Sequence, residues 1–185
     1  MKIENIHLKK LTYAALFLSL GLVLPFLTGQ IPQIGSMLLP MHIPVLFCGL
    51  ICGWQYGAAV GFVLPLLRYV LFGMPMMPGA LSMAFELASY GLVIGLVYSR
   101  LHLRKIVSLY ISMITAMLAG RVVWGAVQTV IFSFGEKVFT FKMFLAGAFL
   151  NAFPGIVLQL VLIPAVMAAL WRAGYEYGSA KKAET

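Results

Sequence analysis

Long apolar segments separated by short polar connections make up most of the chain. A helix needs about 20 apolar residues to cross the hydrocarbon core of a bilayer, and each segment approaches or exceeds that length. Continuous apolar runs favour helices over a β-barrel, whose strands alternate apolar and polar positions. The pattern therefore predicts an all-α integral membrane protein, with apolar segments at about 11–27, 42–72, 80–99, 106–132 and 143–171.

The segment 42–72 is too long for one membrane helix. At 1.5 Å per residue it would measure ~46 Å, whereas the hydrocarbon core of a bilayer is ~30 Å thick. The sequence CGWQYG at 52–57 offers a break between two shorter helices.

The distribution of basic residues favours two helices within 42–72. Lys and Arg residues cluster at 2–10, 100–105 and 172–182. Cytoplasmic loops of membrane proteins are enriched in Lys and Arg, so we expect all three clusters on the cytoplasmic side. An even number of spans must then separate successive clusters, and this requires two helices within 42–72.

The resulting prediction is one domain, residues 1–185, with six transmembrane helices and both termini in the cytoplasm. The second helix is too short for a perpendicular span, so the uncharged loop before it should cover its outer end. We expect the helices at about 8–28, 41–53, 55–72, 79–99, 106–132 and 142–172, followed by a cytoplasmic tail at 173–185.

Composition and charge agree with a membrane protein. The chain of 185 residues is 62% hydrophobic and 10% charged, whereas a soluble domain is roughly half apolar and a quarter charged. The formal net charge of +8 would suggest nucleic acid as a partner of a soluble protein, but basic cytoplasmic loops explain it here. We therefore expect a lipid bilayer around the chain and no nucleic acid.

The sequence carries no motif for catalysis, for a cofactor or for a metal. It has no GxxxxGK[ST] phosphate loop and no HExxH zinc motif. We interpret Cys48 and Cys52 as packing thiols, because two soft ligands alone are weak support for a metal site. The chain also lacks Asp, which leaves few groups to bind a coupling ion. These absences favour a capture subunit that takes its energy from partners.

Polar side chains inside the spans are the candidate functional residues. An ionisable group near the bilayer centre costs about 3 kcal/mol or more unless it is paired or hydrated. Most of these groups fall in the outer half of the predicted helices. The candidate substrate-binding residues are His42, Arg68, Glu86, Arg121, Trp124, Gln128 and Asn151, with Gln159 as a further polar position.

One helix face combines three kinds of chemistry. Arg121, Trp124 and Gln128 follow the i, i+3, i+7 spacing of a single face. A cation, an aromatic plane and an amide together suit a small polar ligand that has a ring or an anionic group.

Structural roles remain open for several of these residues. Arg68 could pair with Glu86 and tie two helices together. His42 could cap its helix at a wet interface. Trp124 could pack in the core rather than stack on a ligand.

The first helix carries a possible docking face. Ala15 and Ser19 lie four residues apart, with Ala14 beside them. A small-xxx-small pattern lets another membrane helix approach closely, so this face suits a partner subunit.

The chain resembles the substrate-binding S components of energy-coupling factor (ECF) vitamin transporters. The similarity covers nearly the whole chain, and the segments LPMHIPVLFCGLICGWQYGAAVGFVLPLLRYVLFGMP and MAFELASYGLVIGLVY carry it. The resemblance implies a multi-pass protein of the bacterial plasma membrane. It also implies a ligand site in the outer half, lidded by the loop from Gln30 to Met41, so Gln30 joins the candidate site.

The resemblance further implies partners and a substrate class. The partners are a transmembrane coupling subunit, which docks on an alanine-rich motif matched here by Ala15-x-x-x-Ser19, and two ATPases. The substrate is a vitamin or cofactor precursor bound with high affinity. Two arginines favour a ligand with a carboxylate or phosphate, and pantothenate, a pyridoxine-like vitamer and a cobalamin-related compound all stay open.

Two other classes of function compete with this interpretation. A self-sufficient small-solute transporter or channel would support flux in liposomes without partners. A membrane enzyme or an assembly scaffold would show turnover, or a stable complex without a small ligand.

Overall fold

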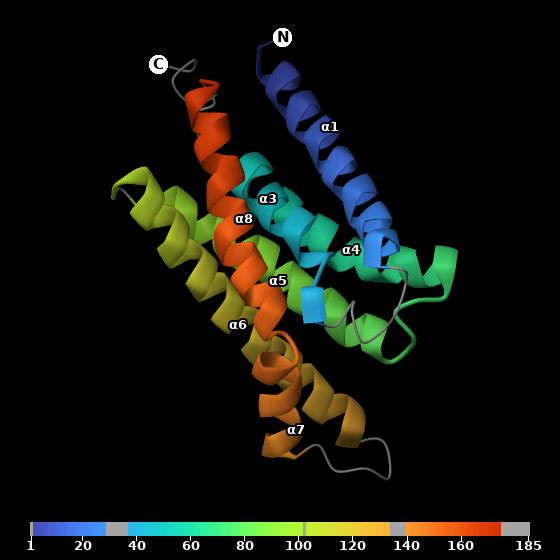
Figure 1. Cartoon of the computed structure of the whole chain (residues 1–185). Coiled ribbons are helices and arrows are strands. Elements are labelled where there is room, and N and C mark those ends of the chain that lie inside the picture. The colour runs from blue at the N-terminus through green and yellow to red at the C-terminus, as the bar shows by residue number, and fades with distance from the viewer. Residues whose placement is uncertain (1, 29–36, 102, 134–139, 175–185) are drawn as a thin grey trace.

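The computed structural model describes residues 2–28, 37–101, 103–133 and 140–174, and every regular element within them is helical (Figure 1). Five helices are long and apolar enough to cross a membrane, and one shorter apolar helix accompanies them. The prediction of an all-α membrane bundle is therefore confirmed.

The first half of the chain supplies α1 and a helical hairpin. Helix α1 covers Lys2–Val23 and continues into the short 3₁₀ helix η1, Leu24–Thr28. Helix α3, His42–Cys52, and helix α4, Trp54–Phe72, form the hairpin. The break falls within the predicted stretch, at Gly53, whose φ of 98° is a backbone conformation that a residue with a Cβ rarely adopts.

The second half differs from the prediction at its last helix. Helix α5 covers Gly79–Arg100 and α6 covers Lys105–Ser133. The helix expected at 142–172 is divided into α7, Phe141–Leu145, the π-helix η2, Ala146–Leu150, and α8, Phe153–Arg172.

Pro154 accounts for this division. It occupies the first turn of α8, where its missing N–H is tolerated, but it cannot donate to the carbonyl oxygen of Leu150 and so interrupts the hydrogen bonds of a continuous helix. The sequence predicts one helix here because apolar residues continue on both sides of the proline.

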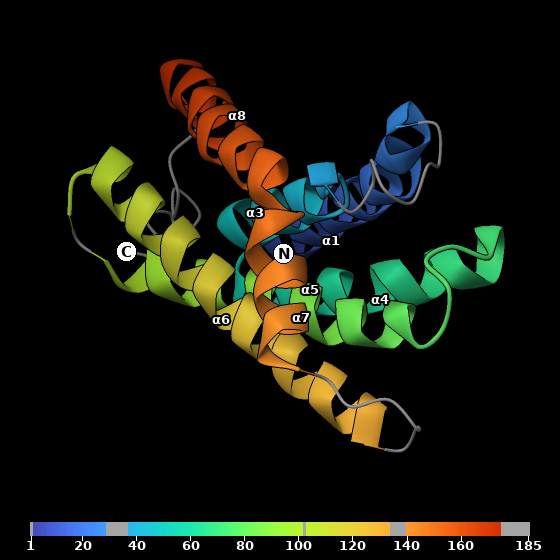
Figure 2. The same cartoon turned by 60° about the horizontal axis from the view of Figure 1, so that its bottom comes forward.

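The connections alternate between the two ends of the bundle. The start of α1 and the end of α8 lie at the upper end of Figure 1, and the connection between α6 and α7 lies at the lower end. In both cartoon views α7 lies beside the second half of α6 (Figures 1 and 2). The basic clusters predict that the upper end faces the cytoplasm.

Glycines bring α3, α4 and α5 into backbone contact. A Cβ at Gly57 of α4 would come within 2.7 Å of the Cα of Gly49 on α3 and of the carbonyl oxygen of Gly91 on α5. A Cβ at Gly95 would come within 2.6 Å of the Cα of Trp54. Small residues allow membrane helices to approach this closely, and the three helices form the rigid centre of the bundle.

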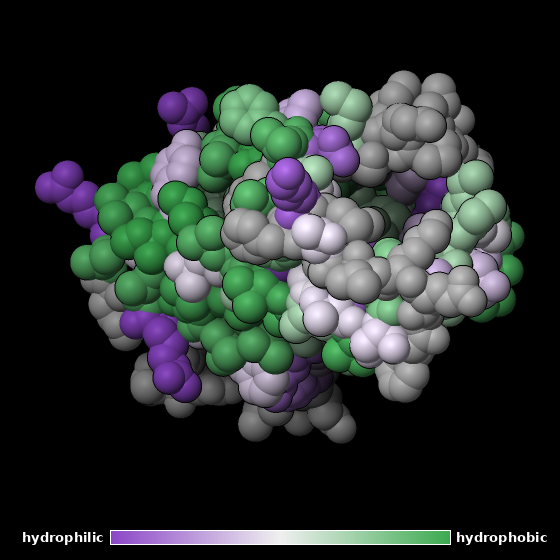
Figure 3. Space-filling model, turned by 90° about the horizontal axis from the view of Figure 1, so that it is seen from below, coloured by the Kyte–Doolittle hydropathy of each residue, from purple (hydrophilic) through white to green (hydrophobic). Residues whose placement is uncertain are grey.

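The surface of the bundle is apolar. Large apolar side chains such as Leu16, Val122 and Val161 are exposed on α1, α6 and α8. The view from below shows apolar side chains over much of that face (Figure 3). Such a surface matches a chain whose surroundings are lipid.

Candidate functional site

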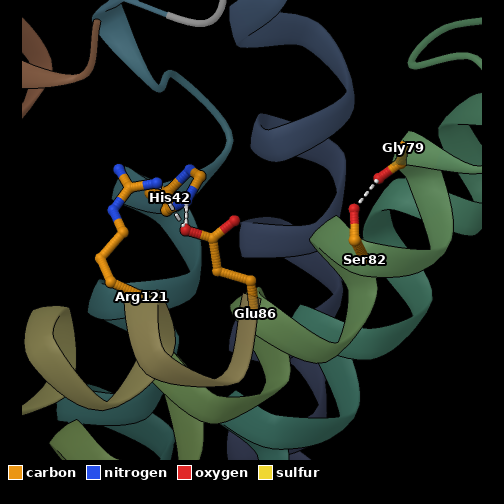
Figure 4. A network of polar contacts seen from close by, with 5 residues as sticks. All are labelled: His42, Gly79, Ser82, Glu86 and Arg121. Atoms are coloured by element: carbon orange, nitrogen blue, oxygen red, sulfur yellow. Dashed lines mark hydrogen bonds and ion pairs between the residues drawn. The ribbon is translucent and has the colours of Figure 1, made fainter. Parts of the chain in front are cut away.

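Three ionisable side chains from three helices meet in the interior of the bundle. The Nη1 atom of Arg121 lies 2.9 Å from the Oε1 atom of Glu86, and the Nε2 atom of His42 lies 3.4 Å from the same oxygen. All three side chains are at most 5% exposed. Figure 4 shows the side chains of Glu86 and Arg121 reaching toward His42, and we call these three residues the buried triad.

Helix direction places the triad in the half of the bundle away from the two termini. Glu86 lies on the second turn of α5, which begins at the end opposite the two termini. Arg121 lies in the second half of α6, which runs toward that end. Ser82, one turn before Glu86, donates instead to the carbonyl oxygen of Gly79 at 3.0 Å (Figure 4). The triad therefore occupies the half of the bundle that the polar pattern indicated.

A strained turn positions His42 at the start of α3. The backbone N–H of His42 donates to the carbonyl oxygen of Leu39 at 3.1 Å. Leu39 has a φ of 51°, which is uncommon for a residue with a bulky side chain. A Cβ at Gly155 of α8 would come within 2.6 Å of the carbonyl oxygen of Met37. The first turn of α8 thus packs directly on the segment that leads into His42.

Tyr90 supports the triad from one turn further along α5. Its ring meets the ring of His42 edge to face, with 5.0 Å between the centroids and 90° between the planes. The ring also covers Gly120, where an added Cβ would overlap it, and Tyr90 is 1% exposed. Tyr90 was not among the predicted site residues. It lies four residues after Glu86, and this spacing places both side chains on one face of α5.

Several nitrogen atoms of the triad have no hydrogen-bond partner within the described residues. They are Nδ1 of His42, Nε and Nη2 of Arg121, and Nε2 of His42, which has only the 3.4 Å contact with Glu86. Buried polar groups in folded proteins are nearly always hydrogen-bonded, and an unsatisfied one costs about 1–3 kcal/mol. This arrangement is typical of a binding site, where a ligand supplies the acceptors.

Arg68 lies in a different environment from the triad. Its Nη1 atom donates to the carbonyl oxygen of Leu22, and its guanidinium carbon lies 5.1 Å and 5.3 Å from the ring centroids of Phe26 and Phe72. The pairing of Arg68 with Glu86, left open by the sequence, is not the arrangement found. Arg68 instead binds one of the last carbonyl groups of α1, which have no partner within that helix.

The remaining candidate site residues are not members of the triad, and each has different surroundings. Trp124 packs on Phe144 of α7, with 6.3 Å between the ring centroids, and it lies against Gly147. Gln128 is half-buried, and Asn151 is exposed at the turn before α8. Gln30 lies outside the described residues, as does most of the loop that was expected to cover the site.

A further buried polar residue lies on α8. Gln159 is 1% exposed, and its Nε2 atom has no hydrogen-bond partner in the described part of the chain. The described residues contain no group of three or more His, Cys, Asp or Glu side chains that could hold a metal ion.

The expected docking residues divide between two faces of α1. Ala15 and Ser19 are exposed, and the Ser19 hydroxyl donates to the carbonyl oxygen of Ala15 at 2.9 Å. Ala14 is 4% exposed and belongs to the hydrophobic core. Only Ala15 and Ser19 are therefore available to an approaching helix.

Comparison with known proteins identifies the family. The model of the family described as "ECF transporter, substrate-specific component" matches residues 9–167, which is most of the chain. Searches of curated proteins and of solved structures found no match. The resemblance read from the sequence is confirmed, as is the membrane location. The chain belongs to the family of substrate-specific components of ECF transporters.

Proposed function

We propose that this protein binds a vitamin or a cofactor precursor with high affinity and delivers it to an ATP-driven ECF importer. The buried triad is the observation that carries the proposal. It joins a guanidinium, a carboxylate and an imidazole in the interior of the bundle, in the half away from the two termini. Such groups are costly in lipid, and proteins retain them there for function.

The substrate contacts in this proposal come mainly from Arg121 and His42. Both have buried nitrogen atoms without a protein partner among the described residues. Glu86 holds the other two side chains in position through its Oε1 atom. Tyr90 keeps the imidazole of His42 in a fixed orientation through the edge-to-face contact.

The partners in this proposal are a transmembrane coupling subunit and two ATPases. Support comes from the exposed pair Ala15 and Ser19 on α1, where small side chains would let a second helix approach. The sequence contains no phosphate-binding loop of its own. Energy for uptake would therefore be supplied by the ATPases.

The first test identifies the bound molecule. The full chain is purified gently in a mild detergent, and native mass spectrometry identifies any small molecule that it releases. One vitamin-sized compound at close to one copy per chain is the expected result. An empty protein that no member of a vitamin panel stabilises would contradict the proposal, as would flux through liposomes that contain this chain alone.

A pair of variants then locates the site. Arg121→Ala should abolish binding of the identified compound, because it removes the main donor group. Arg68→Ala should retain binding, because Arg68 contacts Leu22, Phe26 and Phe72 rather than the triad. Circular dichroism confirms that each variant is folded. Unchanged binding by a folded Arg121→Ala variant would show that the substrate lies elsewhere.

A further inference from the structure

The charges of Arg121 and Glu86 cancel before any ligand arrives. Arg121 carries one positive charge and Glu86 one negative charge, and their nearest atoms lie 2.9 Å apart. The sequence-based preference for a carboxylate or phosphate ligand assumed that two arginines were available. Arg68 is instead enclosed by Phe26 and Phe72 and donates to Leu22. The site therefore has no uncompensated arginine among the described residues.

The guanidinium of Arg121 uses one of its edges for Glu86 and keeps another edge available. Its Nη1 atom contacts the carboxylate, and the Tyr90 hydroxyl lies near the guanidinium, whereas Nε and Nη2 make no hydrogen bond to the described residues. Nε–H and the adjacent Nη2–H point in parallel from the same edge of the planar group. That edge suits two acceptor atoms that lie side by side.

Charge decides which acceptors are suitable. Two parallel donors fit the two oxygens of a carboxylate, but they also fit an oxygen and a nitrogen acceptor on an uncharged ring, as when arginine binds guanine. A carboxylate added to a compensated Arg121–Glu86 pair would leave one net negative charge in the membrane interior. An unpaired buried charge is strongly unfavourable.

We propose that the triad recognises an uncharged part of its ligand, namely a heteroaromatic ring whose carbonyl oxygen and neighbouring ring nitrogen accept from Nε and Nη2 of Arg121. This inference rests on the proposed function and specifies its substrate class. The unpartnered Nδ1 atom of His42 is available for one further hydrogen bond. Of the two ligand types suited to the Arg121 face, a ring and an anionic group, the geometry points to the ring.

The test compares neutral and anionic members of matched pairs. Isothermal titration calorimetry measures the binding of riboflavin, whose ring has a carbonyl oxygen beside a ring nitrogen, against riboflavin 5′-phosphate, and of pantothenol, which has no ring, against pantothenate, within a wider vitamin panel. Binding of pantothenol or pantothenate in preference to every ring compound would overturn this inference. The uncharged member of any pair that binds should bind about 100-fold more tightly. Tighter binding of the anionic member would overturn this inference while supporting the proposed function. Absence of binding across the whole panel would instead contradict the proposed function.

A variant of Glu86 tests the charge argument directly. Glu86→Gln keeps the shape of the side chain but removes the charge that compensates Arg121. We expect the preference for the uncharged member of the binding pair to fall at least about tenfold. Ser82→Ala, one turn before Glu86, is the control, because the Ser82 hydroxyl bonds Gly79 rather than the triad and its loss should keep the preference. An unchanged preference in a folded Glu86→Gln variant would overturn the inference.

Discussion

Arg121 of α6 and Glu86 of α5 form a buried ion pair, with 2.9 Å between Nη1 and Oε1 and side-chain exposures of 5% and 3%. The contact joins two helices that pack along much of their length. It also fixes the orientation of the guanidinium edge that faces away from the carboxylate. A structural role and the proposed recognition role thus meet in one pair of residues.

The ion pair predicts strong non-additivity between mutations. Arg121→Gln or Glu86→Gln alone should lower the free energy of unfolding by about 3–5 kcal/mol, because each leaves an unpaired buried charge. The double variant should be more stable than the sum of the two losses predicts. Thermal unfolding in detergent compares the unmodified protein, the two single variants and the double variant. Additive losses would mean that the two charges do not interact.

Arg68 should contribute to stability and not to ligand binding. Arg68→Leu removes a hydrogen bond from a charged donor, worth about 1.5–3 kcal/mol, as well as the contacts with Phe26 and Phe72. Arg68→Lys keeps the charge but lacks the planar group that stacks on rings, so it should restore only part of the lost stability. Thermal unfolding compares the variants, and calorimetry checks binding. Loss of binding in a folded variant would place Arg68 in the site after all.

The glycine contacts predict a large difference between two chemically identical substitutions on α5. Gly91→Ala places a Cβ against the backbone of Gly57 on α4, whereas a Cβ at Gly79 meets nothing within 4 Å. We expect Gly91→Ala to cost about 1–3 kcal/mol of unfolding free energy, as overpacking does. Gly79→Ala should be neutral or slightly stabilising. Equal thermal stability of the two variants would contradict the close packing of α4 and α5.

Adjacent alanines on α1 should respond differently to a bulky side chain. Ala15→Trp should preserve ligand binding and abolish uptake by the assembled transporter, because Ala15 is exposed on the proposed docking face. Ala14→Trp should instead lower thermal stability, because Ala14 belongs to the core. Val161→Trp, at a 65% exposed position on α8, is the control for bulk on the lipid-facing surface. Normal uptake by the Ala15→Trp variant would show that this face of α1 is not the docking site.

The sequence determined the features that depend on local patterns. The apolar runs predicted the helices, five of which are long and apolar enough to cross a membrane, and the excess length of one run predicted the break that lies at Gly53. The short list of polar residues in the spans also contained every member of the triad. These features are local because lipid acts on each helix separately and requires it to be apolar and of sufficient length.

Only the tertiary structure decided which polar residues meet. The rotation of each helix about its axis and the approach of α3, α4 and α5 at their glycines select Arg121, rather than Arg68, as the partner of Glu86. The same packing brings Tyr90 against His42 and turns Ala14 inward. Hydrophobicity cannot reveal these choices, because almost every face of these helices is apolar. The contacts depend instead on shape, through the few positions where a missing side chain lets two backbones touch.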